Sequence, residues 1–274
     1  MQGKLFIVGT PIGNLGDLSF RGKEVLSSVD YIACEDTRHS SLLLRYYDIK
    51  KTLISYHKHN ERESTDKILE LLKDSKSVAL ISDAGMPAIC DPGAYLIKAA
   101  RDSGIIVESV PGPTALTSAL SISGNDFNGF TFLGFLPEKE SLRVKLIDEF
   151  RGSSLPFVFY CAPHDIQKNI SFLLERIGDR ELILVKEISK IYENVVFSRL
   201  SELKLDTIKG EYVAIVFPET RKIEESEIKI ALQKELKKGC RKSQAVKNVS
   251  ENLNISKNVV YSLALSIDII DEQN

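Results

Sequence analysis

Residues 77–93 have the sequence Ser-Val-Ala-Leu-Ile-Ser-Asp-Ala-Gly-Met-Pro-Ala-Ile-Cys-Asp-Pro-Gly. The short apolar stretch 77–82 predicts a buried strand. A loop with two Asp, two Pro and two Gly follows directly, and a helical pattern then runs to Gly104. A buried strand, a rigid loop and a helix in this order are half of a β-α-β unit, which is the repeating unit of parallel sheets.

The same alternation runs through the first half of the chain. Strands are expected at 4–8, 31–34, 52–56 and 105–110, and helices at 19–28, at 42–47, from Ser64 and from Thr114. Repeated units of this length predict a mainly parallel sheet covered by helices.

The pattern changes near residue 130. Strands are expected at 130–135, 157–160, 182–185, 195–198 and 212–217, with helices at about 141–151 and 165–176. The third and fourth of these strands are too close for a helical crossover and are expected to be antiparallel. After Pro218 the chain is rich in Lys and Glu and helical in pattern. We therefore predict an α/β protein with two α/β domains, 1–124 with a mainly parallel sheet and 125–218 with a mixed sheet, and a helical C-terminal module, 219–274.

Composition narrows the class of protein. The 274 residues are 43% hydrophobic and 27% charged, which is typical of a soluble globular protein. Lys and Arg number 36 and Asp and Glu number 38. This balance excludes a global attraction to nucleic acid or membrane, so any binding to a polyanion must come from a local patch.

The cysteines and the apolar runs indicate the compartment. Cys34, Cys90, Cys161 and Cys240 form no CxxC pair, which argues against a disulfide framework or a cysteine-based zinc site and favours a reducing, cytoplasmic setting. No apolar run approaches the ~20 residues of a membrane span, and the N-terminal segment lacks the pattern of a signal peptide. We expect a cytoplasmic protein.

Three loops at the carboxyl ends of predicted strands have unusual sequences, and ligands of open α/β sheets bind at such ends. The glycine-rich loop 9–16 lacks the Lys-Ser/Thr of a P-loop and the spacing of GxGxxG. It favours a cofactor without a polyphosphate, or is simply a tight turn. Loop 82–93 could fix the carboxylates of Asp83 and Asp91, or be an ordinary turn before a helix. Thr114, after Pro111-Gly112-Pro113, could contact a ligand or cap a helix.

A fourth segment, Cys34-Glu35-Asp36-Thr37-Arg38-His39-Ser40, has five ionisable side chains directly after a strand. Glu35, Asp36 or His39 could accept a proton, and Arg38 could hold a phosphate. The alternative is a solvated loop in which Thr37 or Ser40 caps the next helix.

These segments together resemble the signature blocks of the ribosomal RNA small subunit methyltransferase I family, in the tetrapyrrole-methylase-like superfamily of S-adenosylmethionine-dependent methyltransferases. The similar blocks include 11–15, 35–38, 82–87 with 91–93, 111–115, 134–137, 186–193 and 209–211. The resemblance extends from about Leu5 to Phe217. Cys161 and Asp165 stand where the family usually has Glu and Arg, and Met86 stands where Thr is usual.

The resemblance implies a cofactor cleft between the two α/β domains and a homodimer. It implies methyl transfer from S-adenosylmethionine to the ribose 2′-hydroxyl of a cytidine in 16S ribosomal RNA, near the decoding centre of the small subunit. Glu35 is the first choice as proton acceptor, before Asp36 and His39, and Arg38 is expected to hold RNA. The cofactor pocket is expected to contain Pro11, Gly13, Asp83, Ala84, Gly85, Pro87, Asp91, Pro111, Thr114 and Tyr160.

The tail adds a basic segment. Lys237, Lys238, Arg241 and Lys242 fall within six positions, and two short helices with a turn between them resemble a helix-turn-helix unit that contacts RNA. The alternative is a surface helical cap with solvated lysines.

Two other functions compete with this interpretation. One is a methyltransferase of the same superfamily that acts on a small tetrapyrrole precursor. The other is a non-enzymatic regulator that binds a nucleotide or RNA. His57, His59 and His164 could suggest a metal, since His57 and His59 would share a face if they lay on a strand. No third ligand is identifiable, so a metal site is not expected.

Overall fold

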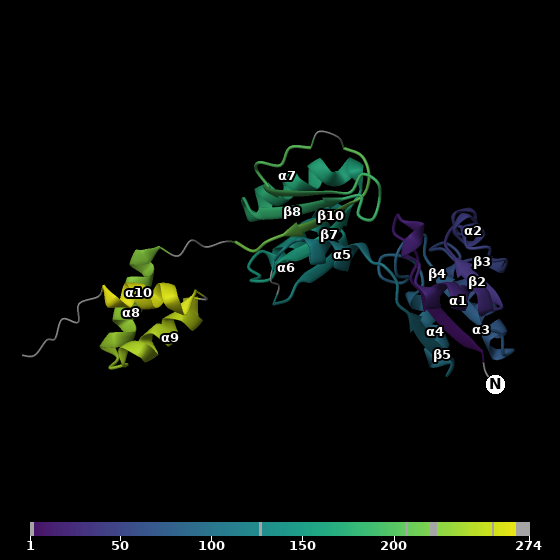
Figure 1. Ribbon diagram of the computed structural model, residues 1–274, viewed down its shortest axis with the longest axis horizontal. Helices are drawn as coiled ribbons and strands as arrows, with labels where there is room; N and C mark the ends of the chain where they lie inside the picture. Colours follow the sequence, from purple (N-terminus) through teal and green to yellow (C-terminus); the bar gives the residue numbers. More distant parts are fainter. Residues whose placement is uncertain (1–2, 126–127, 206–207, 220–223, 254, 267–274) are drawn as a thin grey trace, which may run out of the picture. The chain divides into compact units, whose positions relative to one another are not determined.

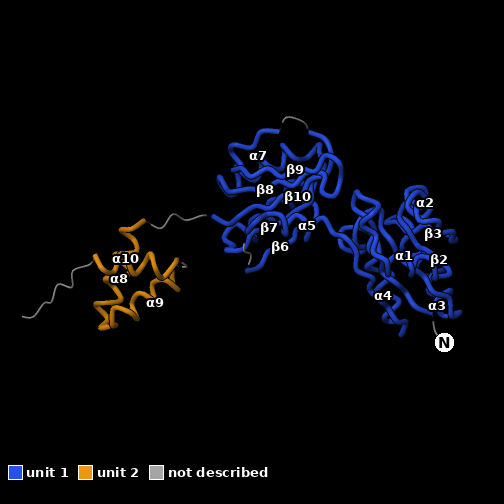
Figure 2. The backbone as a smooth tube through the Cα atoms, viewed as in Figure 1, with its two compact units in different colours: residues 1–219 blue, residues 220–274 orange. Residues whose placement is uncertain are grey.

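The computed structural model describes residues 3–125, 128–205, 208–219, 224–253 and 255–266. The chain divides into two compact units, residues 1–219 and 220–274 (Figure 2). The first unit contains two five-stranded sheets and the second is helical (Figure 1). The predicted α/β class, with one parallel and one mixed sheet, is confirmed.

The first sheet is parallel throughout and has the strand order β3-β2-β4-β1-β5. Every residue of the central strand is buried, as its apolar sequence predicts. The strands are β1 (Lys4–Val8), β2 (Tyr31–Cys34), β3 (Thr52–Ser55), β4 (Val78–Ile81) and β5 (Ile106–Val110).

Helices cover both faces of this sheet. On one face, α1 (Phe20–Ser28) and α2 (Thr37–Tyr46) pack through Leu26 and Leu44. On the other, α3 (Glu61–Lys73) and α4 (Ala94–Asp102) pack through Leu72 and Leu96. Leu26, Leu72 and Leu96 are fully buried, and burial of each contributes about 2 kcal/mol to folding.

Two helices begin earlier than the sequence pattern predicts. Helix α2 begins at Thr37, not Leu42, because the Asp36 carboxylate accepts hydrogen bonds from the backbone N–H groups of Arg38 (2.8 Å) and His39 (3.4 Å). The expected caps, Thr37 and Ser40, are inside the helix instead.

Helix α3 begins at Glu61, not Ser64. The Ser64 hydroxyl donates to the Ser55 carbonyl (3.0 Å) and does not cap the helix. Asn60 closes the preceding turn by donating to the same carbonyl (3.0 Å) and accepting from the His57 backbone N–H (2.8 Å). This turn starts the helix three residues before the expected serine.

The second sheet is mixed and has the order β6-β7-β10-β8-β9. Strands β6 and β7 are parallel and the other pairs are antiparallel, including the β8–β9 pair predicted from its short connection. The strands are β6 (Thr131–Phe135), β7 (Phe157–Cys161), β8 (Glu181–Lys186), β9 (Asn194–Arg199) and β10 (Tyr212–Val216).

Helix α5 (Ala115–Ile122) connects the two sheets. It follows β5 in the chain but packs on the second sheet, where Ala119 lies among Val158, Val213 and Ile215. The opposite face of that sheet is covered by α6 (Glu140–Phe150) and α7 (Ile166–Ile177). The N-terminal end of α5 therefore lies where the last loop of the first sheet meets the core of the second.

The C-terminal unit has a small core of its own. Its helices are α8 (Glu225–Lys237), α9 (Lys242–Leu253) and α10 (Lys257–Leu265). The expectation of two short helices was incomplete, because Leu232 of α8 is buried against Val249 and Val260 of the other two. Among the described residues, no helix is long and apolar enough to cross a membrane.

Two glycines allow the loops after β1 and β5 to touch through their backbones. A Cβ atom on Gly9 would lie 2.7 Å from the Cα of Gly112, and a Cβ on Gly112 would lie 2.7 Å from the Gly9 carbonyl oxygen. Real Cβ atoms do not approach backbone atoms so closely. Both positions therefore require glycine.

Replacing Gly9 by Ala should lower the free energy of unfolding by about 1–3 kcal/mol, because the added methyl group forces the two loops apart. Gly152→Ala is the matched control, since a Cβ at Gly152 would meet nothing within 4 Å. Urea unfolding followed by circular dichroism measures both variants. Equal stability of Gly9→Ala and the wild type would show that the loops are not held in contact.

Candidate functional site

The loops after β1 and β4 are joined by their backbones. The Thr10 N–H donates to the Gly85 carbonyl (2.9 Å) and the Gly85 N–H donates to the Thr10 carbonyl (3.1 Å). The fully buried Thr10 hydroxyl also donates to the Ser82 carbonyl (3.0 Å). Gly85 has a φ of +79°, which favours glycine. The carboxyl edge of the first sheet thus has a fixed backbone frame.

Three acids gather at this edge, and we call Glu35, Asp83 and Asp91 the carboxylate cluster. Burial raises the pKa of Glu35, and the negative charges of Asp91 and Asp83 raise it further. Burial and the charge of Asp83 likewise raise the pKa of Asp91. The positive charge of Lys58 opposes both shifts. The cluster therefore brings together three residues that the sequence placed in two separate loops.

Asp36 has the opposite environment from Glu35. Its pKa is lowered by the hydrogen bond from the Arg38 backbone N–H and by the Arg38 guanidinium, which lies 3.3 Å from Oδ2. Asp36 itself donates its backbone N–H to Asp83 Oδ1 (3.3 Å). His39 is exposed in the first turn of α2. Adjacent acids thus differ: Asp36 caps a helix, and Glu35 holds its proton to higher pH.

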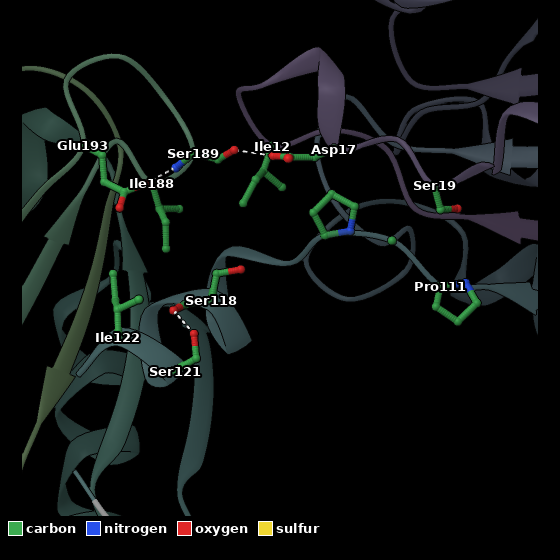
Figure 3. Close-up of a pocket in the computed structure, with 12 residues that line it drawn as sticks. Ile12, Asp17, Ser19, Pro111, Ser118, Ser121, Ile122, Ile188, Ser189 and Glu193 are labelled. Carbon is green, nitrogen blue, oxygen red and sulfur yellow. Dashed lines mark hydrogen bonds between the residues drawn. The ribbon is translucent and has the colours of Figure 1, made fainter. Parts of the chain in front are cut away.

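A cavity of about 640 Å³ lies beside this edge (Figure 3). It is formed by the loops after β1 and β5, by α5, and by the connection between β8 and β9. The Ser189 hydroxyl donates to the Asp17 carboxylate across it, and the Ser189 N–H donates to Glu193 (2.6 Å). The described residues that line it include no Lys or Arg; they are Ile12, Asp17, Ser19, Pro111, Gly112, Pro113, Ser118, Ser121, Ile122, Ile188, Ser189 and Glu193.

Gly85 connects the carboxylate cluster to the cavity. A Cβ atom on Gly85 would lie 3.5 Å from Ile12 Cγ2 and 3.6 Å from the Pro113 carbonyl oxygen, and both of these residues line the cavity. Pro111 is the one predicted cofactor residue in the cavity lining, while Pro11 and Gly13 flank Ile12 in the chain. The loop that carries Asp83 therefore lies against two residues of the cavity lining.

Tyr160 and Thr114 lie at the start of α5. The Tyr160 hydroxyl accepts a hydrogen bond from the Leu116 backbone N–H (3.1 Å). Burial raises the pKa of Tyr160, and the nearby Cys90 and Asp91 raise it further. The Thr114 hydroxyl accepts from the Thr117 backbone N–H (3.3 Å) and caps α5. Tyr160 of the second sheet thus lies close to the carboxylate cluster of the first.

Three residues depart from the family pattern, and the structure shows what each of them contacts. A Cβ on Gly9 would lie 2.7 Å from Met86 Sδ, so Met86 packs beneath the loop contact. Cys161 is buried and accepts a hydrogen bond from Asn169 Nδ2 (3.3 Å), and burial raises its pKa to about 11. Asp165 lies 3.3 Å from His164 Nε2. In the loop after β4, Ala84 is exposed and Pro87 is buried.

The connection between β8 and β9 contains no site residue predicted from the sequence. Lys190 Nζ lies 2.8 Å from both Glu187 Oε1 and Glu211 Oε2, and its Cγ lies 2.3 Å from where a Cβ of Gly13 would be. Lys190 therefore packs against loop 9–16 with its charge neutralised. The positive φ angles of Glu187 and Ser189 cannot be predicted from the sequence. The resemblance of residues 186–193 to the family is the sequence feature that points to this connection.

The two neighbouring histidines do not lie on a strand. His57 and His59 follow the end of β3 in the turn that Asn60 closes, and their ring centroids are 5.9 Å apart. Within the described parts of the chain, no three His, Cys, Asp or Glu residues are grouped so that they could hold a metal ion.

The basic residues of the tail lie in the connection between α8 and α9. Lys237 is the last residue of α8, Arg241 precedes α9 and Lys242 begins it. Lys238 Nζ lies 2.5 Å from Glu235 Oε1. In the described part of the C-terminal unit, Lys237, Arg241 and Lys242 have no ion-pair partner.

Comparison with known proteins identifies the class. A sequence model of the family described as Tetrapyrrole (Corrin/Porphyrin) Methylases matches residues 4–204. Solved structures with a similar fold include uroporphyrin-III-C-methyltransferase from Thermus thermophilus (TM-score 0.56, 21% identity, 79% of this chain and 94% of that chain). Diphthine synthase is also similar (TM-score 0.62, 16% identity, 80% and 91%). The chain belongs to the tetrapyrrole methylase family and is a methyltransferase of that superfamily.

Relatives at higher identity specify the branch of the family. A Bacillus subtilis (strain 168) protein named Ribosomal RNA small subunit methyltransferase I is 37% identical over 272 residues, which are 95% of this chain and 93% of the relative. A Thermotoga maritima protein of the same name is 43% identical over 201 residues, which are 73% and 90%. The resemblance stated from the sequence blocks is thereby confirmed.

Replacing Asp91 by Asn should lower the pKa of Glu35, because one of the negative charges that raise it is removed. The raised pKa means that folded Glu35 binds its proton more tightly than unfolded Glu35. The free energy of unfolding therefore falls as the pH rises from the ordinary glutamate range through the raised pKa. In Asp91→Asn this fall should be smaller.

Carbon-13 NMR titration of the Glu side chains and urea unfolding at several pH values measure the two effects. Asp66→Asn, an exposed carboxylate in α3, is the matched control. An unchanged Glu35 titration in Asp91→Asn would contradict the electrostatic coupling in the cluster.

Proposed function

We propose that this chain transfers the methyl group of S-adenosylmethionine to the ribose 2′-hydroxyl of a cytidine in 16S ribosomal RNA, near the decoding centre of the small subunit. The single observation that carries the proposal is the 37% identity over 95% of the chain to a relative named Ribosomal RNA small subunit methyltransferase I. The cytidine and the 2′-hydroxyl come from the resemblance in the sequence blocks. The carboxylate cluster and the cavity supply chemistry that suits this reaction.

The charge of the cavity fits S-adenosylmethionine. This cofactor has no phosphate and has two positive groups, a sulfonium and an ammonium. The described lining includes the carboxylates of Asp17 and Glu193, several hydroxyls and no Lys or Arg. When bound, the cofactor supplies a methyl group activated by the sulfonium. The residues proposed to hold it are Ile12, Ser118, Ile188 and the predicted set Pro11, Gly13, Asp83, Ala84, Gly85, Pro87, Asp91, Pro111, Thr114 and Tyr160.

Glu35 is proposed as the acceptor of the ribose proton. A hydroxyl is a weak nucleophile, and a base with a pKa close to the working pH removes its proton best. Burial and the neighbouring acids raise the pKa of Glu35, whereas the capping contacts lower the pKa of Asp36. Two adjacent acids with opposite shifts favour separate roles. Asp36 and His39 then orient α2 and the substrate and are not the first proton acceptor.

RNA contacts are proposed at two places. Arg38 is 91% exposed at the start of α2, close in the chain to Glu35, where it could hold a phosphate beside the reacting ribose. Lys237, Lys238, Arg241 and Lys242 form a second basic group in the separate C-terminal unit. A contact in a separate unit would add affinity without altering the chemistry of the site.

Compartment and assembly belong to the same proposal. All four cysteines are free in the structure, which suits a reducing cytoplasm. We expect a homodimer and a cofactor cleft between residues 1–124 and 125–218, with 219–274 as an accessory module. Sedimentation velocity of the purified chain tests the dimer.

Replacing Glu35 by Gln should lower the single-turnover rate of methyl transfer to small ribosomal subunits by about 100-fold or more, because the proton acceptor is lost. The affinity for S-adenosylmethionine, measured by calorimetry, should change less than about 2-fold, since a neutral side chain of equal size remains. Glu63→Gln is the matched control, because Glu63 is exposed and pairs with Lys67 on the surface of α3.

An unaltered rate in Glu35→Gln would remove this residue from the role. The wild type should also be tested with a porphyrinogen precursor in place of the small subunit. Methylation of the precursor and none of the RNA would favour the small-molecule alternative. Absence of S-adenosylmethionine binding would favour a non-enzymatic protein.

Deleting residues 220–274 should weaken binding to small-subunit RNA and flatten its salt dependence, because basic residues that displace counterions are removed. The triple replacement of Lys237, Arg241 and Lys242 by Ala is the matched variant, since it keeps the helical core. It should reduce the slope of log K against log salt by up to about 2, at roughly 0.7 per lost phosphate contact. Equal affinity and slope in both variants would show that the tail is a surface cap.

A further inference from the structure

The outer face of α2 has exposed basic and apolar side chains. Arg38, Leu42, Arg45 and Tyr46 recur at intervals of one and two helical turns and are all exposed, while Leu43 and Leu44 face the core. Leu42 is 62% and Tyr46 63% exposed. The sequence of α2 has no acidic residue. Such a face is not explained by the packing of the first sheet.

Tyr47 connects this face to α1. Its ring lies 5.0 Å from the ring of Tyr46, its hydroxyl donates to the Leu15 carbonyl, and Lys23 Nζ lies 5.7 Å from its centroid. Phe20, one turn before Lys23 on α1, is 91% exposed. We define the α1–α2 face as Phe20, Lys23, Arg38, Leu42, Arg45 and Tyr46.

The charge of this face is complementary to nucleic acid. Helices α1 and α2 together have four Lys or Arg residues (Arg21, Lys23, Arg38, Arg45) and one acid, Glu24, whereas the whole chain has a net charge of −2. Within the described residues, neither Lys23 nor Arg45 has an ion-pair partner. Their charges are therefore available to a polyanion.

The α1–α2 face starts at the carboxylate cluster. Glu35 and Asp36 directly precede α2, and Arg38 begins its exposed side. Arg45 follows seven residues later, which is about 10 Å along a helix. Exposed aromatic rings between spaced cations suit an unpaired nucleic acid strand, because the rings stack on bases and the cations hold phosphates.

We propose that the α1–α2 face holds the unpaired RNA strand that flanks the target nucleotide. Arg38 and Arg45 hold separate phosphates, and Tyr46 and Phe20 stack on unpaired bases. This inference rests on the proposed function and adds to it the residues that recognise the substrate strand. It makes the face a positioning surface, since none of these side chains takes part in the methyl transfer.

Full-length variants test the proposal on small ribosomal subunits and on an unpaired RNA oligonucleotide. In Tyr46→Ala the KM for subunits and the Kd for the oligonucleotide should rise about 10-fold, while kcat changes less than about 2-fold. Tyr46→Phe should keep wild-type affinity because it keeps the ring. Arg45→Gln should lower the slope of log K against log salt by about 0.7. Phe20→Ala, at a 91% exposed position, should repeat the effect of Tyr46→Ala and serves if the latter folds poorly.

The matched controls lie elsewhere on the first unit. Phe197→Ala removes a ring that is 65% exposed on β9, and Arg101→Gln removes a cation in the last turn of α4, at the opposite edge of the first sheet from the candidate site. Neither should change KM or the salt slope. Calorimetry should give an unchanged affinity for S-adenosylmethionine in all variants.

Three results would overturn the proposal. If the wild type methylates subunit RNA and the α1–α2 variants behave like the controls, the face does not hold RNA and the proposed function stands. If Tyr46→Ala alters the molar mass in sedimentation velocity, the face is a contact between copies of the chain. If the wild type neither binds nor methylates RNA, the proposed function fails first and this inference fails with it.

Discussion

The contact between backbones at the carboxyl edge of the first sheet is the constraint on which the candidate site depends. Gly9 and Gly112 approach so closely that a Cβ on either would overlap the other's backbone, and Thr10 and Gly85 exchange two hydrogen bonds. Three loops that are far apart in sequence are therefore fixed to one another. The backbone amides and carbonyls of Thr10 and Gly85 are hydrogen-bonded to each other. The backbone that carries the neighbouring side chains is therefore held in place.

This frame determines how the acids differ. The loop that Gly85 fixes also carries Asp83 and Asp91, which lie close enough to Glu35 to raise its pKa. Asp83 in turn accepts a hydrogen bond from the backbone of Asp36, whose own carboxylate is used as a helix cap. A short hydrogen-bonded path thus runs from the β4 loop to the start of α2. The opposite pKa shifts of Glu35 and Asp36 follow from their surroundings and not from residue type.

Much of the fold was predictable because its signals are local. The strands β1, β2 and β4 are short, mainly apolar runs bounded by glycine or by polar residues, and this pattern is enough to predict them. The start of α2 is not predictable from its apolar residues, which begin at Leu42, because the cap at Asp36 adds a polar first turn before them. The cavity is a longer-range feature. Ser189 and Asp17 are bonded across 172 residues of sequence, and no local pattern specifies which distant loops meet.

Local charge, and not net charge, decides how this chain meets a polyanion. At a net charge of −2 the whole molecule repels RNA weakly, and at physiological salt that repulsion is screened beyond about 8 Å. The charges that attract or repel an approaching RNA strand are therefore those within about 8 Å of it. Beside the carboxylate cluster lie the exposed Lys58 and the helix α2, and the charged residues of α2 are all basic. The same helix thus begins with a cap that lowers the pKa of Asp36 and continues as a surface that attracts phosphates. Acids and bases lie a few residues apart here because Asp36 caps the helix and pairs with Arg38 (3.3 Å), while the rest of α2 contains no acid.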